Sequence, residues 1–274
     1  MKLMKVLLPL LTVLAAVVYG GILIRERFYT DTEPPVISFD SDTITVSVYD
    51  PEEALLSDVT AADAQDGDLS QSVMVRSISQ LIGGSSAKVS YIVFDSADNM
   101  ATASRMVVYS DYEAPRFELT EPLVYPTNST ITLQDRLFVR DAIDGDLSGS
   151  IRLVTENINI YQAGVYDLTV LVTNSMGDSA TLTLPVIIRD DSDQDPVLTL
   201  TDYVVYLEQG ASFDPEDYFD SVRETAEDPA SHDGRDVSIA SAVDPQTAGT
   251  YRVTYTYENE DGLDTEAILT VVVQ

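Results

Sequence analysis

The chain has 274 residues, with 46 acidic and 15 basic side chains, one histidine and no cysteine, and its formal net charge is −31. The lack of cysteine excludes disulfides and thiol nucleophiles, and the single His232 excludes a multi-histidine metal site. So large a negative charge repels phosphate backbones, and we therefore expect no nucleic-acid partner. Because 45% of the residues are hydrophobic, the chain still has enough apolar mass to fill packed cores.

An apolar segment lies near the amino terminus between two basic flanks. Two lysines precede residues 6–24, which carry no charge, and two arginines follow. As a helix this segment would be about 28 Å long, close to the hydrocarbon thickness of a bilayer. We predict a transmembrane anchor at residues 6–24, after a cytoplasmic segment at residues 1–5 and before a linker at residues 25–32. The alternative is a cleaved signal peptide, which would make the protein secreted.

Both alternatives place the rest of the chain outside the cytoplasm. An exported chain without cysteine fits a bacterial surface protein better than a eukaryotic secreted protein, whose small domains usually contain disulfides. The sequence therefore predicts a single-pass protein of the cell membrane with extracytoplasmic C-terminal repeats.

Three copies of one sequence unit fill the rest of the chain. Each ends in two long alternating runs around a turn, at residues 87–108, 164–188 and 249–273. Alternation with period two, rich in Val, Ile, Thr and Tyr, is typical of half-buried strands. We predict an all-β chain of three tandem β-sandwiches. Their assigned boundaries are residues 33–110, 111–190 and 191–274.

The second repeat illustrates the predicted packing. Leu168 and Val170 on one strand face Leu182 and Leu184 on the next, and we assign these side chains to the core. Pro185 lies in the second of these strands and cannot donate a backbone hydrogen bond, which indicates an edge strand.

Four tyrosines have predicted structural roles. Tyr166 and Tyr251 each begin a long strand close to a glycine, as in a tyrosine corner, so their hydroxyls should bond back to a nearby backbone. Tyr255 and Tyr257 share one face of their strand, which we assign to the core.

The repeated motifs resemble a known family. Asp63–Ser70 and Asp141–Ser148 share the pattern D-x-x-DGDLS, and Gly164 and Gly249 each open the pattern G-x-Y. Together with the Ala-Pro openings, these motifs are similar to bacterial immunoglobulin-like (Ig-like) repeats of the type first noted in pesticidal crystal proteins, which are related in style to hyalin-repeat and cadherin-like modules. The resemblance implies that the chain forms three tandem Ig-like β-sandwiches. The first repeat departs from the pattern, because Ala87 stands where the others have tyrosine. The resemblance implies surface stalks and adhesion arrays, and it names no ligand.

Acidic residues recur in the loops at one predicted end of each sandwich. Carboxylates gathered in this way repel one another unless a cation neutralises them, and calcium prefers such oxygen ligands. We therefore predict calcium at the domain junctions, as the cadherin-like resemblance also implies. The candidate ligands are Asp63, Asp66, Asp68, Asp95, Asp111, Asp141, Asp144, Asp146, Asp233 and Asp236. Asp31 and Glu33 belong to the same set in the first repeat.

Turn formation is the alternative role for these acids. The four acids of the two Asp-Gly-Asp turns are the first candidates for calcium, yet glycine supplies positive φ there and aspartate caps its own backbone without any metal. The spacing also differs from an EF-hand loop, which needs a glutamate at its twelfth position.

We predict a non-enzymatic cell-surface stalk or interaction protein whose partner is an unknown surface protein or glycan. We assign no catalytic residue, because the carboxylate pairs lie in repeated turns and His232 lies in a polar insertion. The alternative is a lectin-like or protein-binding adhesin. The third repeat would be its binding head, because it carries the insertion at residues 224–231.

Overall fold

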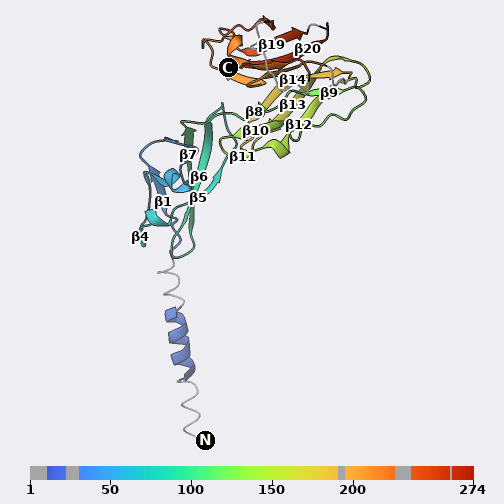
Figure 1. The fold of residues 1–274 in the computed structure, drawn as a ribbon. Coiled ribbons are helices and arrows are strands. Elements are labelled where there is room, and N and C mark those ends of the chain that lie inside the picture. Colours follow the sequence, from blue (N-terminus) through green and yellow to red (C-terminus); the bar gives the residue numbers. More distant parts are fainter. Residues whose placement is uncertain (1–10, 23–30, 191–194, 226–235, 260) are drawn as a thin grey trace, which may run out of the picture. The chain divides into compact units, whose positions relative to one another are not determined.

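The computed structural model describes residues 11–22, 31–190, 195–225, 236–259 and 261–274. The chain divides into two compact units, of which the first ends at Asp111 and the second begins at Tyr112. After the N-terminal helix, the described residues form strands and short 3-10 helices (Figure 1). The predicted all-β fold of three tandem sandwiches is confirmed.

The N-terminal segment is helical over residues 11–22 (Figure 1). The predicted anchor at residues 6–24 extends past both ends of this helix, into parts of the chain outside the described residues. The predicted segment at residues 1–5 and most of the linker also lie outside them. Among the described helices, none is long and apolar enough to cross a membrane.

The first repeat contains a three-stranded and a four-stranded sheet. The smaller sheet has the order β1 (Val36–Phe39), β3 (Val59–Asp63), β4 (Gly67–Asp68). The larger sheet has the order β2 (Thr43–Val46), β7 (Met100–Tyr109), β6 (Ser86–Phe94), β5 (Met74–Ile78). Two 3-10 helices lie in its connections, η1 (Glu52–Leu56) and η2 (Ser70–Ser72).

The second repeat has the same organisation. Its smaller sheet has the order β11 (Gly145–Asp146), β10 (Leu137–Asp141), β8 (Arg116–Leu119). Its larger sheet has the order β12 (Arg152–Glu156), β13 (Gly164–Thr173), β14 (Ser179–Arg189), β9 (Val124–Pro126). The 3-10 helix η3 (Ser148–Ser150) corresponds to η2.

The third repeat has the same larger sheet, but its smaller sheet has fewer strands in the described residues. Its larger sheet has the order β16 (Val204–Leu207), β20 (Asp264–Val273), β19 (Gly249–Glu258), β18 (Ser238–Ser241). In the described part of the chain its smaller sheet pairs β15 (Val197–Leu200) with β17 (Phe219–Arg223), and η4 (Pro215–Tyr218) precedes β17.

Each larger sheet is built on the hairpin that the alternating runs predict. The hairpins are β6–β7, β13–β14 and β19–β20, and all three are antiparallel. The last strand of each hairpin also pairs in parallel with a short strand from the start of its repeat: β7 with β2, β14 with β9 and β20 with β16. The second and last strands of a repeat therefore lie side by side.

The predicted edge position is confirmed at Pro185, because the described pairing on the other side of β14 begins only at Ile187. This strand pairs with β13 along its length, and Ile187–Arg189 pair with β9 on the other side. Pro185 precedes the segment that faces β9, so its missing N–H group removes no hydrogen bond to that strand.

The predicted core of the second repeat is confirmed, because Leu168, Val170, Leu182 and Leu184 are at most 3% exposed. The core also extends beyond one sandwich. Within the unit that begins at Tyr112, buried side chains of the second and third repeats form one contiguous hydrophobic cluster. These two repeats therefore share part of their apolar stabilisation.

Tyr206 of β16 lies at the contact between these two repeats. Its hydroxyl accepts a hydrogen bond from the Phe117 N–H (2.9 Å), and the Arg116 guanidinium lies 5.2 Å from the centre of its ring. Burial raises the pKa of the Tyr206 hydroxyl. This tyrosine therefore joins the start of β8 to the third repeat.

The predicted tyrosine corners are present. The Tyr166 hydroxyl donates to the Gln162 carbonyl (2.9 Å), and the Tyr251 hydroxyl donates to the Thr247 carbonyl (2.9 Å). Each bond fixes the loop that enters a long strand. The assignment of the face of β19 that carries Tyr255 to the core is also confirmed, because Tyr255 is fully buried.

Candidate functional site

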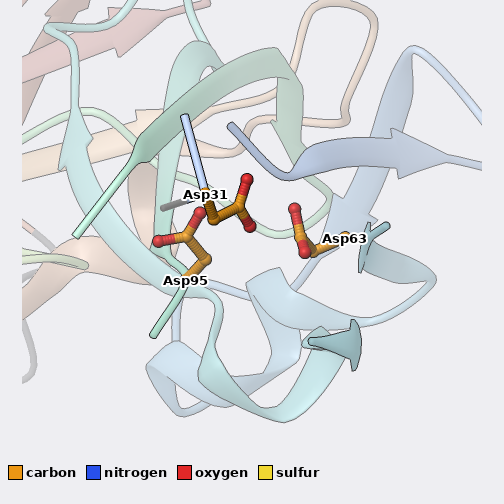
Figure 2. A group of neighbouring side chains, drawn as sticks. All are labelled: Asp31, Asp63 and Asp95. Atoms are coloured by element: carbon orange, nitrogen blue, oxygen red, sulfur yellow. The ribbon is translucent and has the colours of Figure 1, made fainter. Parts of the chain in front are cut away.

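Three carboxylates of the first repeat converge at one point (Figure 2). Asp31 precedes β1, Asp63 ends β3 and Asp95 follows β6. One oxygen of each carboxylate lies within 4.8 Å of the others. Figure 2 shows the three side chains around a common space, with Asp31 and Asp95 on one side and Asp63 on the other. The fold thus brings together three of the acids that the sequence groups in this repeat.

Asp63 is held by the turn that follows it. Its Oδ1 accepts hydrogen bonds from the N–H groups of Asp66 (2.9 Å) and Gln65 (2.7 Å). These bonds, the one from Asp66 first, hold the pKa of Asp63 below its usual value, because they stabilise the charged form. No hydrogen bond within the described part of the chain occupies the other oxygen, Oδ2.

Asp95 is the most buried of the three carboxylates, at 7% exposure. Its Oδ1 accepts hydrogen bonds from the N–H groups of Ala97 (2.9 Å) and Asn99 (2.7 Å). Its Oδ2 accepts from the Asn99 side-chain amide (2.7 Å), which also donates to the Asp31 carbonyl (3.2 Å). Asn99 therefore ties the segment that enters the repeat to the β6–β7 hairpin.

Asp31 has an oxygen with no hydrogen-bond donor. Its Oδ1 accepts from the Glu33 N–H (3.0 Å), but its Oδ2 is buried and has no partner among the described residues. A buried polar atom without a partner costs about 1–3 kcal/mol, and more when it is charged. A bound cation would remove this cost and the repulsion among the three carboxylates, and hard cations such as calcium take carboxylate oxygens as ligands.

The corresponding place in the second repeat is filled by a closed hydrogen-bond network. Asn174 follows β13 as Asp95 follows β6, and its Nδ2 donates to Asp141 Oδ2 (3.1 Å) and to the Tyr112 hydroxyl (2.9 Å). Its Oδ1 accepts from the Asp178 N–H (2.9 Å), and the Tyr112 hydroxyl donates to Asp178 Oδ2 (2.7 Å). Burial first, and then the bond to Asp178, raise the pKa of Tyr112. We call these four residues the Asn174 network.

The Asn174 network contains its own hydrogen-bond donors. An amide stands where the first repeat has Asp95, and the phenol of Tyr112 fills the place of a third carboxylate. The charge on Asp141 is therefore satisfied by protein groups. The motifs of the two repeats look equivalent in sequence, but the described residues place three converging carboxylates only in the first.

The third repeat also carries an amide at this position. Asn259 follows β19, and its Oδ1 accepts hydrogen bonds from the N–H groups of Leu263 (2.8 Å) and Asp261 (3.1 Å). Asp236 is exposed in the turn before β18. Asp233, a predicted ligand, lies outside the described residues.

Two acids of the Asp-Gly-Asp turns bind the neighbouring hairpin. Asp66 accepts hydrogen bonds from the N–H (2.7 Å) and hydroxyl (2.8 Å) of Ser96. Asp144 accepts from the N–H (2.5 Å) and hydroxyl (2.7 Å) of Ser175 in the same way. Each carboxylate therefore links its turn to the last hairpin of its repeat, which is a structural role.

The other predicted ligands are also occupied by nearby donors. Asp68 and Asp146 each accept from the hydroxyl and the N–H of a serine two residues on, and these bonds lower the pKa of both carboxyl groups. Asp111 accepts from a serine hydroxyl (2.6 Å) and a backbone N–H (2.9 Å) of the loop after β2, which lower its pKa. Calcium at these positions stays a prediction.

Residues 199–273 match the family model for the bacterial surface protein, Ig-like domain. The third repeat is a bacterial surface Ig-like domain. The resemblance to bacterial Ig-like repeats that the sequence indicates is therefore confirmed.

Two relatives are similar in sequence to parts of this chain. Pesticidal crystal protein Cry22Aa of Bacillus thuringiensis is 35% identical over 118 residues, which are 42% of this chain and 15% of that protein. Internalin I of Listeria monocytogenes is 25% identical over 170 residues, which are 61% of this chain and 9% of that protein. The chain thus spans only a small part of either relative.

Among solved structures, the protocadherin gammaB4 extracellular domain aligns with 89% of this chain and 49% of its own, at 14% identity and a TM-score of 0.21. That score is too low to support an argument about function.

Proposed function

We propose that the protein is a non-enzymatic surface protein of a bacterium, whose Ig-like repeats mediate adhesion or association with a surface protein or glycan. The main support is the match of the third repeat to the bacterial surface Ig-like domain. The other two repeats have the same strand order in their larger sheets. Sandwiches of this kind present loops at their ends, where binding residues can vary without changing the fold.

The proposal includes attachment to the membrane through residues 6–24, with the repeats on the extracytoplasmic side. The uncharged segment between basic flanks supports it. Protease treatment of intact cells that carry a C-terminally tagged chain tests this location. The tag should be lost while a cytoplasmic marker survives, and a protected tag would contradict the proposal. Release of the tagged chain into the medium would indicate cleavage of the segment.

We also propose that the first repeat binds one calcium ion at Asp31, Asp63 and Asp95. The support is the buried Asp31 Oδ2, which has no partner among the described residues, and the free Oδ2 of Asp63. Such an ion would join the entering segment to the loops after β3 and β6. Extracellular calcium sites of this type have dissociation constants of about 10⁻⁴ to 10⁻³ M.

Thermal unfolding with calcium or with a chelator tests this site. At a calcium concentration about tenfold above the dissociation constant, the first repeat should gain about 1.4 kcal/mol and unfold several degrees higher. Asp95→Asn should abolish the gain. Asp98→Asn is the matched control, because it lies in the same hairpin and has a positive φ of 65° that asparagine tolerates. An equal gain in Asp95→Asn and the wild type would refute the site.

A lectin-like or protein-binding adhesin with the third repeat as its binding head is the second candidate. The polar insertion at residues 224–231, which the other repeats lack, is the feature that favours it. Most of the insertion at residues 224–231 lies outside the described residues. Deleting the insertion should abolish binding to cells or glycans if it forms the head, and unchanged binding would favour a plain stalk.

A further inference from the structure

A hollow of about 630 Å³ lies between the second and third repeats, within the unit that begins at Tyr112. The second repeat lines it with the segment around β9 and with the end of β14, and the third repeat lines it with β15 and β17. Its volume is in the range of sites that bind small molecules. It is separate from the carboxylates of the first repeat and does not depend on calcium.

Three arginines line this hollow in a strongly acidic protein. They are Arg136, Arg189 and Arg223, and they stand among 14 lining residues. From residue 28 onward the chain has only 11 basic residues against 45 acidic ones. Glu121 and Asp220 also line the hollow, so it presents both cationic and anionic groups to a ligand. At physiological ionic strength the screening length is about 8 Å, so these local charges outweigh the distant acids for a bound ligand.

Arg136 is held in place by the second repeat. Its Nε pairs with Glu121 (3.4 Å), and its Nη1 donates to the carbonyls of Pro122 (2.8 Å) and Val124 (3.3 Å). Its guanidinium lies 4.9 Å from the centre of the Tyr125 ring. Within the described part of the chain, its Nη2 has no acceptor. The side chain is therefore fixed with one donor group unused.

Arg189 has more unused donors. Its Nη1 donates to the Thr265 hydroxyl (3.3 Å), and in the described residues no carboxylate pairs with it. Its Nη2 and Nε have no acceptor there either. A guanidinium with parallel free N–H groups matches the two oxygens of a carboxylate or the oxygens of a phosphate.

The other polar groups of the hollow favour a ligand with hydroxyl groups. Asp220 Oδ2 accepts from the hydroxyls of Thr199 (2.9 Å) and Ser221 (3.2 Å), and these bonds leave its Oδ1 to accept from a ligand hydroxyl. Asp220 and Glu121 would repel a doubly charged phosphate more strongly than a singly charged carboxylate. The chemistry of the hollow therefore fits a molecule with one carboxylate and several hydroxyls.

We propose that this hollow binds an acidic saccharide, whose carboxylate is held by Arg136 and Arg189 and whose hydroxyls are held by Asp220 and Thr199. The site lies at the contact between two repeats, so a ligand there touches both sandwiches. This inference rests on the proposed association with a glycan, and it places the contact at the joint and not at the loop ends or the insertion of the third repeat.

Binding of sialyllactose to the purified full-length chain, measured by isothermal titration and by ligand-observed NMR, tests the proposal. Neutral lactose and a short peptide with a free C-terminal carboxylate serve as the comparison probes. Sialyllactose, or a galacturonic acid oligosaccharide in the same assay, should bind at least about tenfold more tightly than lactose, and its binding should weaken at high salt.

Arg189→Gln should weaken this binding by at least about tenfold, which corresponds to the loss of a charge-assisted contact. Arg152→Gln, on the exposed strand β12, is the matched control and should bind as the wild type does. Unfolding temperatures of both variants report whether each is folded. The proposal is overturned if neither acidic saccharide binds, if lactose binds equally well, if only the peptide binds, or if folded Arg189→Gln binds normally.

Discussion

Replacing Asn174 by aspartate would place a second carboxylate beside Asp141, at the position that Asp95 has in the first repeat. Asn174 is 5% exposed, and its Nδ2 lies 3.1 Å from Asp141 Oδ2. Asn174→Asp replaces this hydrogen bond by two carboxylate oxygens at a similar distance. Two unit charges so placed repel by about 5 kcal/mol at an effective dielectric constant of about 20. Relaxation lowers the cost, so in chelator the free energy of unfolding should fall by about 3–5 kcal/mol.

Calcium should recover part of this loss, because the new carboxylate lies beside that of Asp141 as Asp95 lies beside Asp63 in the first repeat. At a concentration about tenfold above the dissociation constant, the recovery should be at least about 1.4 kcal/mol. Urea unfolding, monitored by tyrosine fluorescence with calcium and with chelator, measures both the loss of stability and its recovery. Asn159→Asp adds the same charge at an exposed loop position and should show neither effect. A loss below about 1 kcal/mol in chelator would show that the two carboxylates do not repel as expected, and no recovery with calcium would show that they do not bind the ion.

Three further changes test individual contacts. Tyr251→Phe removes the bond to the Thr247 carbonyl and should cost about 1 kcal/mol in denaturant unfolding, whereas no change would contradict the corner assignment. The lowered pKa of Asp146 means that its stabilisation is present above about pH 4 and is lost as the pH falls further. Asp146→Asn should therefore flatten the pH dependence of the unfolding temperature below about pH 4, and identical profiles would contradict this. Tyr206→Phe removes the acceptor for the Phe117 N–H and should lower the free energy of unfolding by about 0.5–1.5 kcal/mol. Calorimetry should then resolve separate unfolding of the second and third repeats. A single unshifted transition would argue against their coupling.

The strands could be predicted because their pattern is local. Alternating apolar residues define the hairpins, and Leu168 and Val170 are buried as the alternation requires. The tyrosine corners follow from a short motif for the same reason. Pro185 indicated the open edge of β14 correctly, but the sequence could not predict that β9 joins this strand at Ile187, because that pairing is not local.

The candidate sites depend on contacts that the sequence does not specify. The acids of the first repeat could be grouped by motif, but only the fold shows that Asp31 keeps a buried oxygen without a partner in the described chain. The first-choice acid Asp66 instead accepts hydrogen bonds from Ser96. The structure shows that Asn174 takes the position of Asp95, and no sequence motif marks its partner Tyr112.

The hollow between the repeats was equally hidden in the sequence. Arg136 and Arg189 lie more than 50 residues apart in the chain, and no motif links them. Only the packing of the second repeat against the third places them around the same space. Predicting the hollow would have required the geometry of the contact between the second and third repeats.

The claim that calcium binds at the three carboxylates of the first repeat can be checked by the number of calcium ions bound per chain, since three similar repeats could bind three ions. Isothermal titration of the purified full-length chain with calcium should give one site per chain, because Asp31, Asp63 and Asp95 converge in the first repeat whereas Asn174 closes the second. The site should vanish in Asp95→Asn. No binding at millimolar calcium, or the same stoichiometry in wild type and Asp95→Asn, would contradict the claim.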